Sequence, residues 1–262
     1  MSIFHYASPQ TFYPLAGHLA RLFAVIAAVL AAIGLYIGFF VAPADAQQGE
    51  VYRIIFIHVP AAWMAMFIYV VMAGYAVLTL VWRARLSAMM IRALAPTGAL
   101  MAAISLWTGA IWGKPTWGTY WAWDARMTST LILLFLYLGH MALLNAIEDR
   151  TRADRAGAVL LLVGVINVPI IYFSVQWWNT LHQGASVKPG GSSMATVMLQ
   201  AMMIMNFSFW SYAIAVSLHR VRTIILECER HTRWVGALPL PGAAPTPHGE
   251  LAASASHRPQ GR

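Results

Sequence analysis

The sequence predicts an all-α, polytopic membrane protein with about six transmembrane helices and both termini in the cytoplasm. Hydrophobic residues make up 60% of the chain and charged residues only 10%. The apolar residues form runs of roughly 20 rather than the stripes of amphipathic helices. Arginines and lysines gather in alternate connections between these runs. Long uncharged stretches do not suit a soluble core, so a single membrane domain is expected.

Six apolar runs predict the helices, and they cover residues 22–41, 54–82, 93–112, 128–147, 156–178 and 194–218. Each can cross a hydrocarbon core about 30 Å thick, since a helix rises about 1.5 Å per residue. The second run is the longest, and we expect it to be tilted or partly interfacial. Cytoplasmic segments 1–21 and 219–262 flank this membrane domain. From about residue 239 the composition predicts a disordered tail.

Basic residues predict the orientation. One side of the predicted membrane domain holds only Arg53, Lys114, Arg126 and Lys188. The other side holds Arg21, Arg83, Arg85, Arg92, Arg150, Arg152, Arg155, Arg220, Arg222, Arg230 and Arg233. By the positive-inside rule the richer side is cytoplasmic, so three connections are expected to face outward.

Several other classes of protein are disfavoured. The formal charge of +8 arises from small basic groups between apolar runs, which membrane topology explains better than nucleic-acid binding. Cys228 is the only cysteine, so neither a disulfide framework nor CxxC chemistry is expected. The residues Ala44-Asp45-Ala46 have the form of a signal-peptidase site, but the preceding run is longer than a typical signal sequence. We therefore expect the first run to remain as a helix.

The second outward connection, at about residues 113–127, is rich in aromatic residues. It and its border contain Trp112, Trp117, Tyr120, Trp121 and Trp123. An aromatic belt at the lipid headgroups is one interpretation. We favour a binding platform, because flat indole faces suit a large planar ligand such as a porphyrin, and Arg126 can meet carboxylates at its edge. Asp124 and Arg126 contact the ligand or form a local ion pair or helix cap.

Two of the nine histidines are placed to reach this loop. His58 lies one helical turn inside the second run, and His182 follows the outer end of the fifth, so both are expected at the same outer level. Each alone can be a structural, hydrogen-bonded histidine. Together, beside an aromatic loop, they can supply two axial imidazoles to one haem iron.

The remaining candidates have simpler interpretations. His140 is too deep in the fourth run to reach the same iron and is expected to serve helix packing. The other histidines, at positions 5, 18, 219, 231, 248 and 257, are cytoplasmic on this topology. Methionines in the sixth run can bind copper, but adaptable apolar packing suits them better. Pro60 can bend the second helix near His58.

A family resemblance rests on the aromatic loop and the two histidine segments. The string from Trp117 to Arg126 resembles the WGxxWxWDxR signature of the WWD-domain family of haem-handling proteins. Residues 57–63, IHVPAAW, and 178–184, WNTLHQG, look like the two histidine segments of its CcmC branch, which serves cytochrome c maturation. The likeness covers nearly all six runs. Met127 replaces a leucine that is usual in the family, which is a conservative change.

The resemblance implies that this loop holds haem b as a transient cargo outside the bacterial inner membrane. His58 and His182 would be the axial metal ligands, and no catalytic residue or enzyme activity is implied. The implied partners are the periplasmic haem chaperone CcmE, the ABC-transporter subunits CcmA and CcmB, and the small membrane protein CcmD. Longer synthetase-type relatives share the tryptophan signature but have further helices and histidines, which this chain lacks.

Two other functions stay open. A b-type cytochrome subunit would keep its haem for electron transfer, but such proteins usually place the ligating histidines inside opposed helices. A stand-alone haem transporter would move haem by itself. The sequence has no evident inverted repeat, no interrupted pair of helices near the midplane and no ATP-binding motif, which weakens that alternative.

Overall fold

The computed structural model describes residues 7–178, 180–182, 184, 187–188 and 191–238. Residues up to Ile225 form one compact unit, and those from Leu226 form a separate one that contains the short helix α8 (Arg233–Gly236). The predicted disordered tail lies outside the described residues. The elements of the first unit are α1 (Pro9–Tyr36), the π-helical turn η2 (Ile37–Val41), the 3-10 helix η3 (Glu50–Ile54), α2 (Ile55–Trp82), α3 (Arg85–Trp117), α4 (Ala125–Ala146), α5 (Arg150–Gly164), α6 (Asn167–Trp177), the strands β1 (Val187–Lys188) and β2 (Gly191–Ser192), and α7 (Thr196–Cys228), which runs into the second unit.

Six helical stretches within the described residues are long and apolar enough to cross a membrane. They are Pro9–Val41, Glu50–Trp82, Arg85–Trp117, Ala125–Ala146, Arg150–Trp177 and Thr196–Cys228. The prediction of an all-α, polytopic membrane protein is therefore confirmed. The antiparallel β1–β2 hairpin, in the third predicted outward connection, was not predicted.

Most of the helices extend beyond the apolar runs that predicted them. The first helix begins at Pro9 rather than near residue 22. The Ser8 side chain caps this start by accepting from the Thr11 N–H. The third ends at Trp117, where Gly118 adopts the left-handed conformation at φ 78°. Hydropathy does not record these ends, because capping residues decide where a helix begins and stops. The aromatic connection is accordingly shorter than residues 113–127.

The fifth span is not continuous. A turn at Val165 and Ile166 separates α5 from α6, so one predicted helix is two. Pro169 lies in the first turn of α6 and has no N–H for the carbonyl of Val165, which favours a break here. The Asn167 side chain donates to the Ser129 carbonyl at 2.9 Å and so holds the start of α6 against α4. This single break was not predicted from the sequence, and it does not contradict the expectation of no interrupted pair of helices near the midplane.

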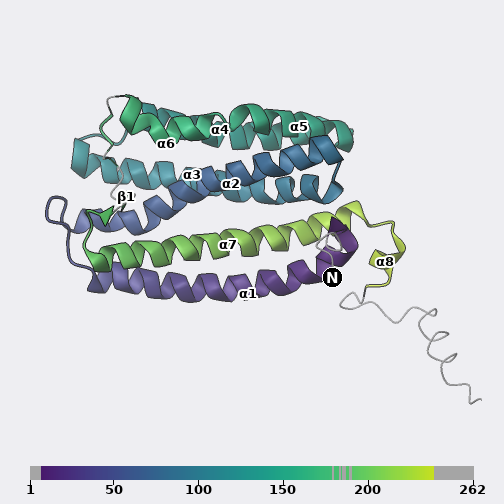
Figure 1. Ribbon diagram of the computed structural model, residues 1–262, viewed down its shortest axis with the longest axis horizontal. Helices are drawn as coiled ribbons and strands as arrows, with labels where there is room; N and C mark the ends of the chain where they lie inside the picture. The colour runs from purple at the N-terminus through teal and green to yellow at the C-terminus, as the bar shows by residue number, and fades with distance from the viewer. Residues whose placement is uncertain (1–6, 179, 183, 185–186, 189–190, 239–262) are drawn as a thin grey trace, which may run out of the picture. The chain divides into compact units, whose positions relative to one another are not determined.

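The helices pack around α2 and α3, which contact each other along their length (Figure 1). On one side, α4 contacts α3, α5 and α6, and α5 contacts α2. The principal apolar core lies here, around Tyr69 and Tyr137. On the other side, α7 packs on α1, where Ser208 Oγ donates to the Ala27 carbonyl at 2.9 Å. The stacked rings of Phe67 and Trp210 join α7 to α2, with centroids 4.6 Å apart.

The connections that carry the predicted site lie at one end of this unit. Figure 1 places the η2–α2 connection, the end of α3 and the β hairpin together at the left, whereas the α2–α3 and α4–α5 connections lie at the opposite end. Chain segments far apart in sequence therefore meet where His58 and the aromatic loop lie.

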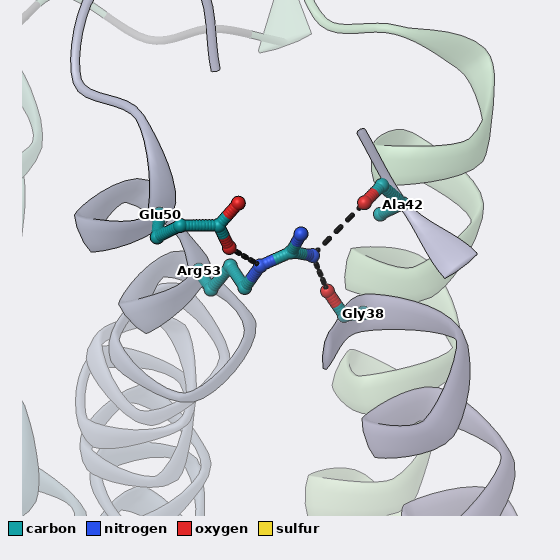
Figure 2. A network of polar contacts seen from close by, with 4 residues as sticks. All are labelled: Gly38, Ala42, Glu50 and Arg53. Atoms are coloured by element: carbon teal, nitrogen blue, oxygen red, sulfur yellow. Dashed lines mark hydrogen bonds and ion pairs between the residues drawn. The ribbon is translucent and has the colours of Figure 1, made fainter. Parts of the chain in front are cut away.

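Arg53 fastens the first of these connections (Figure 2). Its Nη1 donates to the carbonyls of Gly38 at 2.5 Å and Ala42 at 2.9 Å, and its Nε donates to the Glu50 carboxylate. These carbonyls end the first span and have no helical partner of their own. Arg53 thus joins the end of η2 to η3, which leads directly into α2.

Replacing Arg53 by methionine should lower the midpoint of thermal unfolding in detergent by roughly 3–10 °C, since charge-assisted hydrogen bonds contribute about 1.5–3 kcal/mol. The apolar stem is kept and the donors are lost. The exposed Arg152, replaced by methionine in the same way, is the matched control. Equal midpoints for the two variants would show that the Arg53 contacts add no stability.

The Ala44-Asp45-Ala46 segment forms a closed turn. Asp45 Oδ1 accepts from the N–H groups of Gln47 at 3.0 Å and Gln48 at 2.9 Å. The backbones of Asp45 and Gly49 also exchange two hydrogen bonds. Retention of the first helix stays a prediction.

Candidate functional site

The two histidines singled out from the sequence lie side by side. His58 is in the first turn of α2 and is 7% exposed, and His182 is half-buried in the connection between α6 and β1. Their ring centroids are 6.1 Å apart, and the ring planes are inclined by 42°. Their side chains meet although 124 positions separate them in sequence (182 minus 58).

Two tryptophans extend this pair into a row of rings. Trp112 meets His58 edge-on with ring centroids 5.6 Å apart, and the ring centroids of Trp117 and His182 are 5.2 Å apart. Trp112 also donates from Nε1 to Gln48 Oε1 at 2.7 Å, which ties the first outward connection to the site. Both indoles come from the last turns of α3, so this helix end borders both histidines.

Asp124 secures the segment that carries His182. Its Oδ1 accepts from the Met127 N–H at 2.7 Å and caps α4, while its Oδ2 accepts from Thr180 Oγ1 at 2.5 Å. Thr180 Oγ1 in turn accepts from the His182 backbone N–H at 3.0 Å. The cap predicted as one alternative is present, and the same carboxylate also holds the histidine segment.

Arg126 points toward α6. Its Nε donates to Ser174 Oγ at 3.3 Å, and its Nη2 donates to the backbone carbonyls of Ile171 at 3.5 Å and Tyr172 at 3.3 Å. It is half-buried and belongs to the first turn of α4. The alternative of a local ion pair with Asp124 is not seen among the described contacts. Arg126 fastens the start of α4 to the helix that leads to His182.

The other predicted aromatic residues divide into two groups. Trp121 is half-buried, and its Nε1 is buried with no hydrogen-bond partner among the described residues. Trp123 meets Trp121 edge-on, with centroids 5.3 Å apart, but is itself 79% exposed. Tyr120 is also exposed, and Lys114 Nζ lies over its ring at 5.4 Å. Within the described part of the chain, neither Tyr120 nor Trp123 has a ring contact with a histidine.

The surroundings keep the His182 ring neutral. Burial lowers the pKa of its imidazole to about 3, and the neighbouring His58 and Arg126 lower it as well. A neutral imidazole keeps one nitrogen lone pair, which is the form that binds a metal.

The protein ligands present here are too few to hold a bare ion. In the described ranges, no three side chains of histidine, cysteine, aspartate or glutamate lie close enough together for that. Two imidazoles offer two ligands, whereas isolated ions in proteins usually take four or more. A metal bound between His58 and His182 would have to bring further ligands with it.

Residues outside the site have structural surroundings. His140 is fully buried and lies against Gly157, where an added Cβ would be 2.8 Å from His140 Cε1. Met198, Met202 and Met205 are buried in an apolar cluster with Phe56. Both placements agree with packing roles.

Several residues that shape the site were missed from the sequence. Thr108 lies 3.0 Å from His58 Nδ1, and Gly109 leaves room for the same ring, since an added Cβ would lie 3.0 Å from His58 Cε1. Thr180 and Gln48 make the contacts given above. A helical projection of α3 places Thr108 and Trp112 four residues apart on one face, which is a signal that was available.

Comparison with known proteins gives consistent matches. A family model described as Heme exporter protein C, CcmC, matches residues 2–236. The Heme exporter protein C of Haemophilus influenzae is 46% identical over 234 residues, which is 89% of this chain and 95% of that protein. The protein of that name in Escherichia coli is 44% identical over 232 residues, 88% and 94% of the two chains. The one in Bradyrhizobium diazoefficiens is 48% identical over 228 residues, 87% and 86%.

Fold and site together define a polytopic membrane protein that brings two imidazoles and a tryptophan-rich loop together at one end of its helices. The family model covers most of the chain, and relatives above 40% identity align with nearly their whole length. The chain belongs to the Heme exporter protein C (CcmC) family.

Proposed function

We propose that this protein binds haem b between His58 and His182 and presents it to the haem chaperone CcmE for c-type cytochrome biogenesis. It would do so at the periplasmic face of the bacterial inner membrane, with the ABC-transporter subunits CcmA and CcmB and with CcmD. Haem is a cargo in this role: its iron binds the two histidines and is released, and the proposal requires no other chemical step on this chain. The role is therefore transport rather than enzyme catalysis.

The distance between the two imidazoles carries the proposal. Two imidazoles that bind one iron from opposite sides have ring centroids roughly 6 Å apart, since each metal–nitrogen bond is about 2 Å and each nitrogen lies about 1 Å from its ring centre. The observed 6.1 Å matches this value. A porphyrin supplies four nitrogen ligands to its iron, so the two imidazoles are enough to complete six-coordination.

The surrounding side chains suit a planar tetrapyrrole. Trp112 and Trp117 border the histidines and offer apolar ring surfaces. The buried Nε1 of Trp121, unpartnered among the described residues, can donate to an acceptor on a bound ligand. Tyr120 and Trp123 expose most of their surface, so they are free to contact haem or a docked chaperone.

The distribution of charge supports the orientation. Arg83, Arg85, Arg150 and Arg152 lie at the ends of α2–α3 and α4–α5 that are remote from His58. By the positive-inside rule that end is cytoplasmic and the histidine end is periplasmic.

Release of haem requires the chaperone to make contacts that favour the haem-free state of the site.

Purification of the protein with the chaperone in detergent tests the proposal. We expect a low-spin, six-coordinate haem spectrum, and haem should appear on the chaperone as it disappears from this chain. Rapid reversible reduction by quinol without transfer would instead indicate a b-type electron-transfer subunit. Export of haem by this chain alone in sealed vesicles would indicate a stand-alone transporter.

Gly109 provides a further prediction. Replacement by alanine should reduce bound haem, because the new methyl group displaces the His58 ring by a few tenths of an ångström. Helix stability should not fall, since alanine is favoured over glycine by about 1 kcal/mol within a helix. Gly74→Ala on α2 is the control, as its added Cβ meets nothing within 4 Å. Equal haem content in the two variants would contradict a tight fit around His58.

A further inference from the structure

The contact between Thr108 and His58 determines which nitrogen of His58 carries its proton. Thr108 Oγ1 lies 2.6 Å from the Ile104 carbonyl and 3.0 Å from His58 Nδ1. The Ser105 carbonyl also lies 3.3 Å from Thr108 Oγ1. Carbonyls can only accept, so the single hydroxyl proton of Thr108 is directed to these carbonyls and not to His58. The Thr108 oxygen then accepts from His58, and the proton lies on Nδ1.

This arrangement leaves Nε2 of His58 with its lone pair. Neutral imidazole has one N–H, so a proton on Nδ1 excludes one on Nε2. Both partners are buried, with His58 7% and Thr108 6% exposed, so water does not compete readily for the bond. Gly109 and Trp112 border the same ring from α3 and limit its rotation.

Among the described residues, the His182 ring is held differently from the His58 ring. Its Nδ1 is buried and finds no hydrogen-bond partner in the part of the chain that the structure describes. Its segment is held through the backbone, by the His182 N–H and Thr180, rather than through the ring. A histidine whose second nitrogen donates a hydrogen bond is a more basic and better oriented metal ligand than one without that bond.

We propose that Thr108 is a positioning residue that holds His58 in the Nε2-ligating form, and that the two axial ligands are therefore unequal. His58 is the ligand that stays on the iron, and His182 is the ligand that leaves first when haem is passed on. This inference rests on the proposed haem-binding function. It adds an order of release that equal ligands would not have.

Haem dissociation measures the role of Thr108. In Thr108→Val the rate of haem loss to apomyoglobin should rise about tenfold or more, the effect typical of removing a hydrogen bond to a metal-ligating histidine. Thr108→Ser keeps the hydroxyl and should restore most of the retention. Thr79→Val is the matched control, because Thr79 is a buried threonine that donates to the Tyr75 carbonyl at 2.9 Å and has no histidine partner among the described residues. Equal rates for Thr108→Val and Thr79→Val would overturn the role of Thr108.

Carbon monoxide tests the order of release in the wild-type protein, with the carbon monoxide adducts of the two histidine variants as references. It replaces the more weakly held axial ligand of reduced haem. Resonance Raman bands of the wild-type adduct should match those of His182→Ala, in which His58 is the remaining ligand. A match to His58→Ala would overturn the order. If wild-type haem is not six-coordinate before carbon monoxide is added, the proposed function itself fails, which separates the two results.

Discussion

Purified His58→Ala and His182→Ala proteins are each expected to retain less than about a tenth of the haem of the wild type, because each removes one of two axial ligands. Any haem that remains should be five-coordinate and high-spin. The ring centroids lie 6.1 Å apart, and each ring would supply a single iron ligand, so the loss of either leaves the iron one ligand short. Absorption spectra of protein purified in detergent, normalised to protein, measure both effects.

His18→Ala is the control for these variants. His18 is exposed on α1, and its Nδ1 contacts the Pro14 carbonyl at 2.9 Å, remote in sequence from the aromatic loop. Its replacement should leave the haem spectrum unchanged. Wild-type haem content and chaperone loading in both site variants would rule out these histidines as the ligands.

Asp124→Ala is expected to lower haem affinity by about 10- to 100-fold, although Asp124 need not touch haem. The change removes the acceptor that holds Thr180 and, through it, the backbone of His182. It also removes the cap of α4, which costs about 1 kcal/mol of stability. Haem titration of the variant and the wild type measures the loss of affinity.

Two further variants separate the role of Asp124 as the cap of α4 from its role as the acceptor for Thr180. Asp149 caps α5 by accepting from the Arg152 N–H at 2.7 Å, and in the part of the chain that the structure describes no hydrogen bond links it to a histidine. Asp149→Ala should therefore lower stability by a similar amount and leave haem affinity unchanged. Asp124→Asn keeps an N-cap oxygen and a group that can bond Thr180, so it should retain most of the affinity. Equal haem affinities for Asp124→Ala and Asp149→Ala would show that Asp124 acts only as a cap.

The membrane fold could be predicted from the sequence because uninterrupted apolar runs have few alternatives. The ends of the helices could not, since they depend on particular groups such as the Ser8 cap and the left-handed Gly118. The break before Asn167 also escaped prediction, because Val165 and Ile166 are as apolar as their neighbours. Only Pro169 marked it.

The site could be predicted in part, because depth along a helix is readable from sequence and the lateral position of a side chain is not. His58 and His182 were expected at one level and do lie together. The contacts of Asp124 with Thr180, and of Thr108 with His58, join residues about 50 or more positions apart. Nothing in a single sequence pairs such residues, so the groups that orient the histidines emerged only from the fold.

Paramagnetic resonance of the ferric haem complex tests the central claim most directly. Protein labelled with ¹⁵N at histidine and reconstituted with unlabelled haem should give a low-spin signal with electron–nuclear double resonance couplings from two histidine nitrogens. His58→Ala and His182→Ala should each remove one of these couplings. A wild-type signal with one histidine nitrogen or none, or one that neither variant changes, would contradict ligation of a single haem iron by His58 and His182.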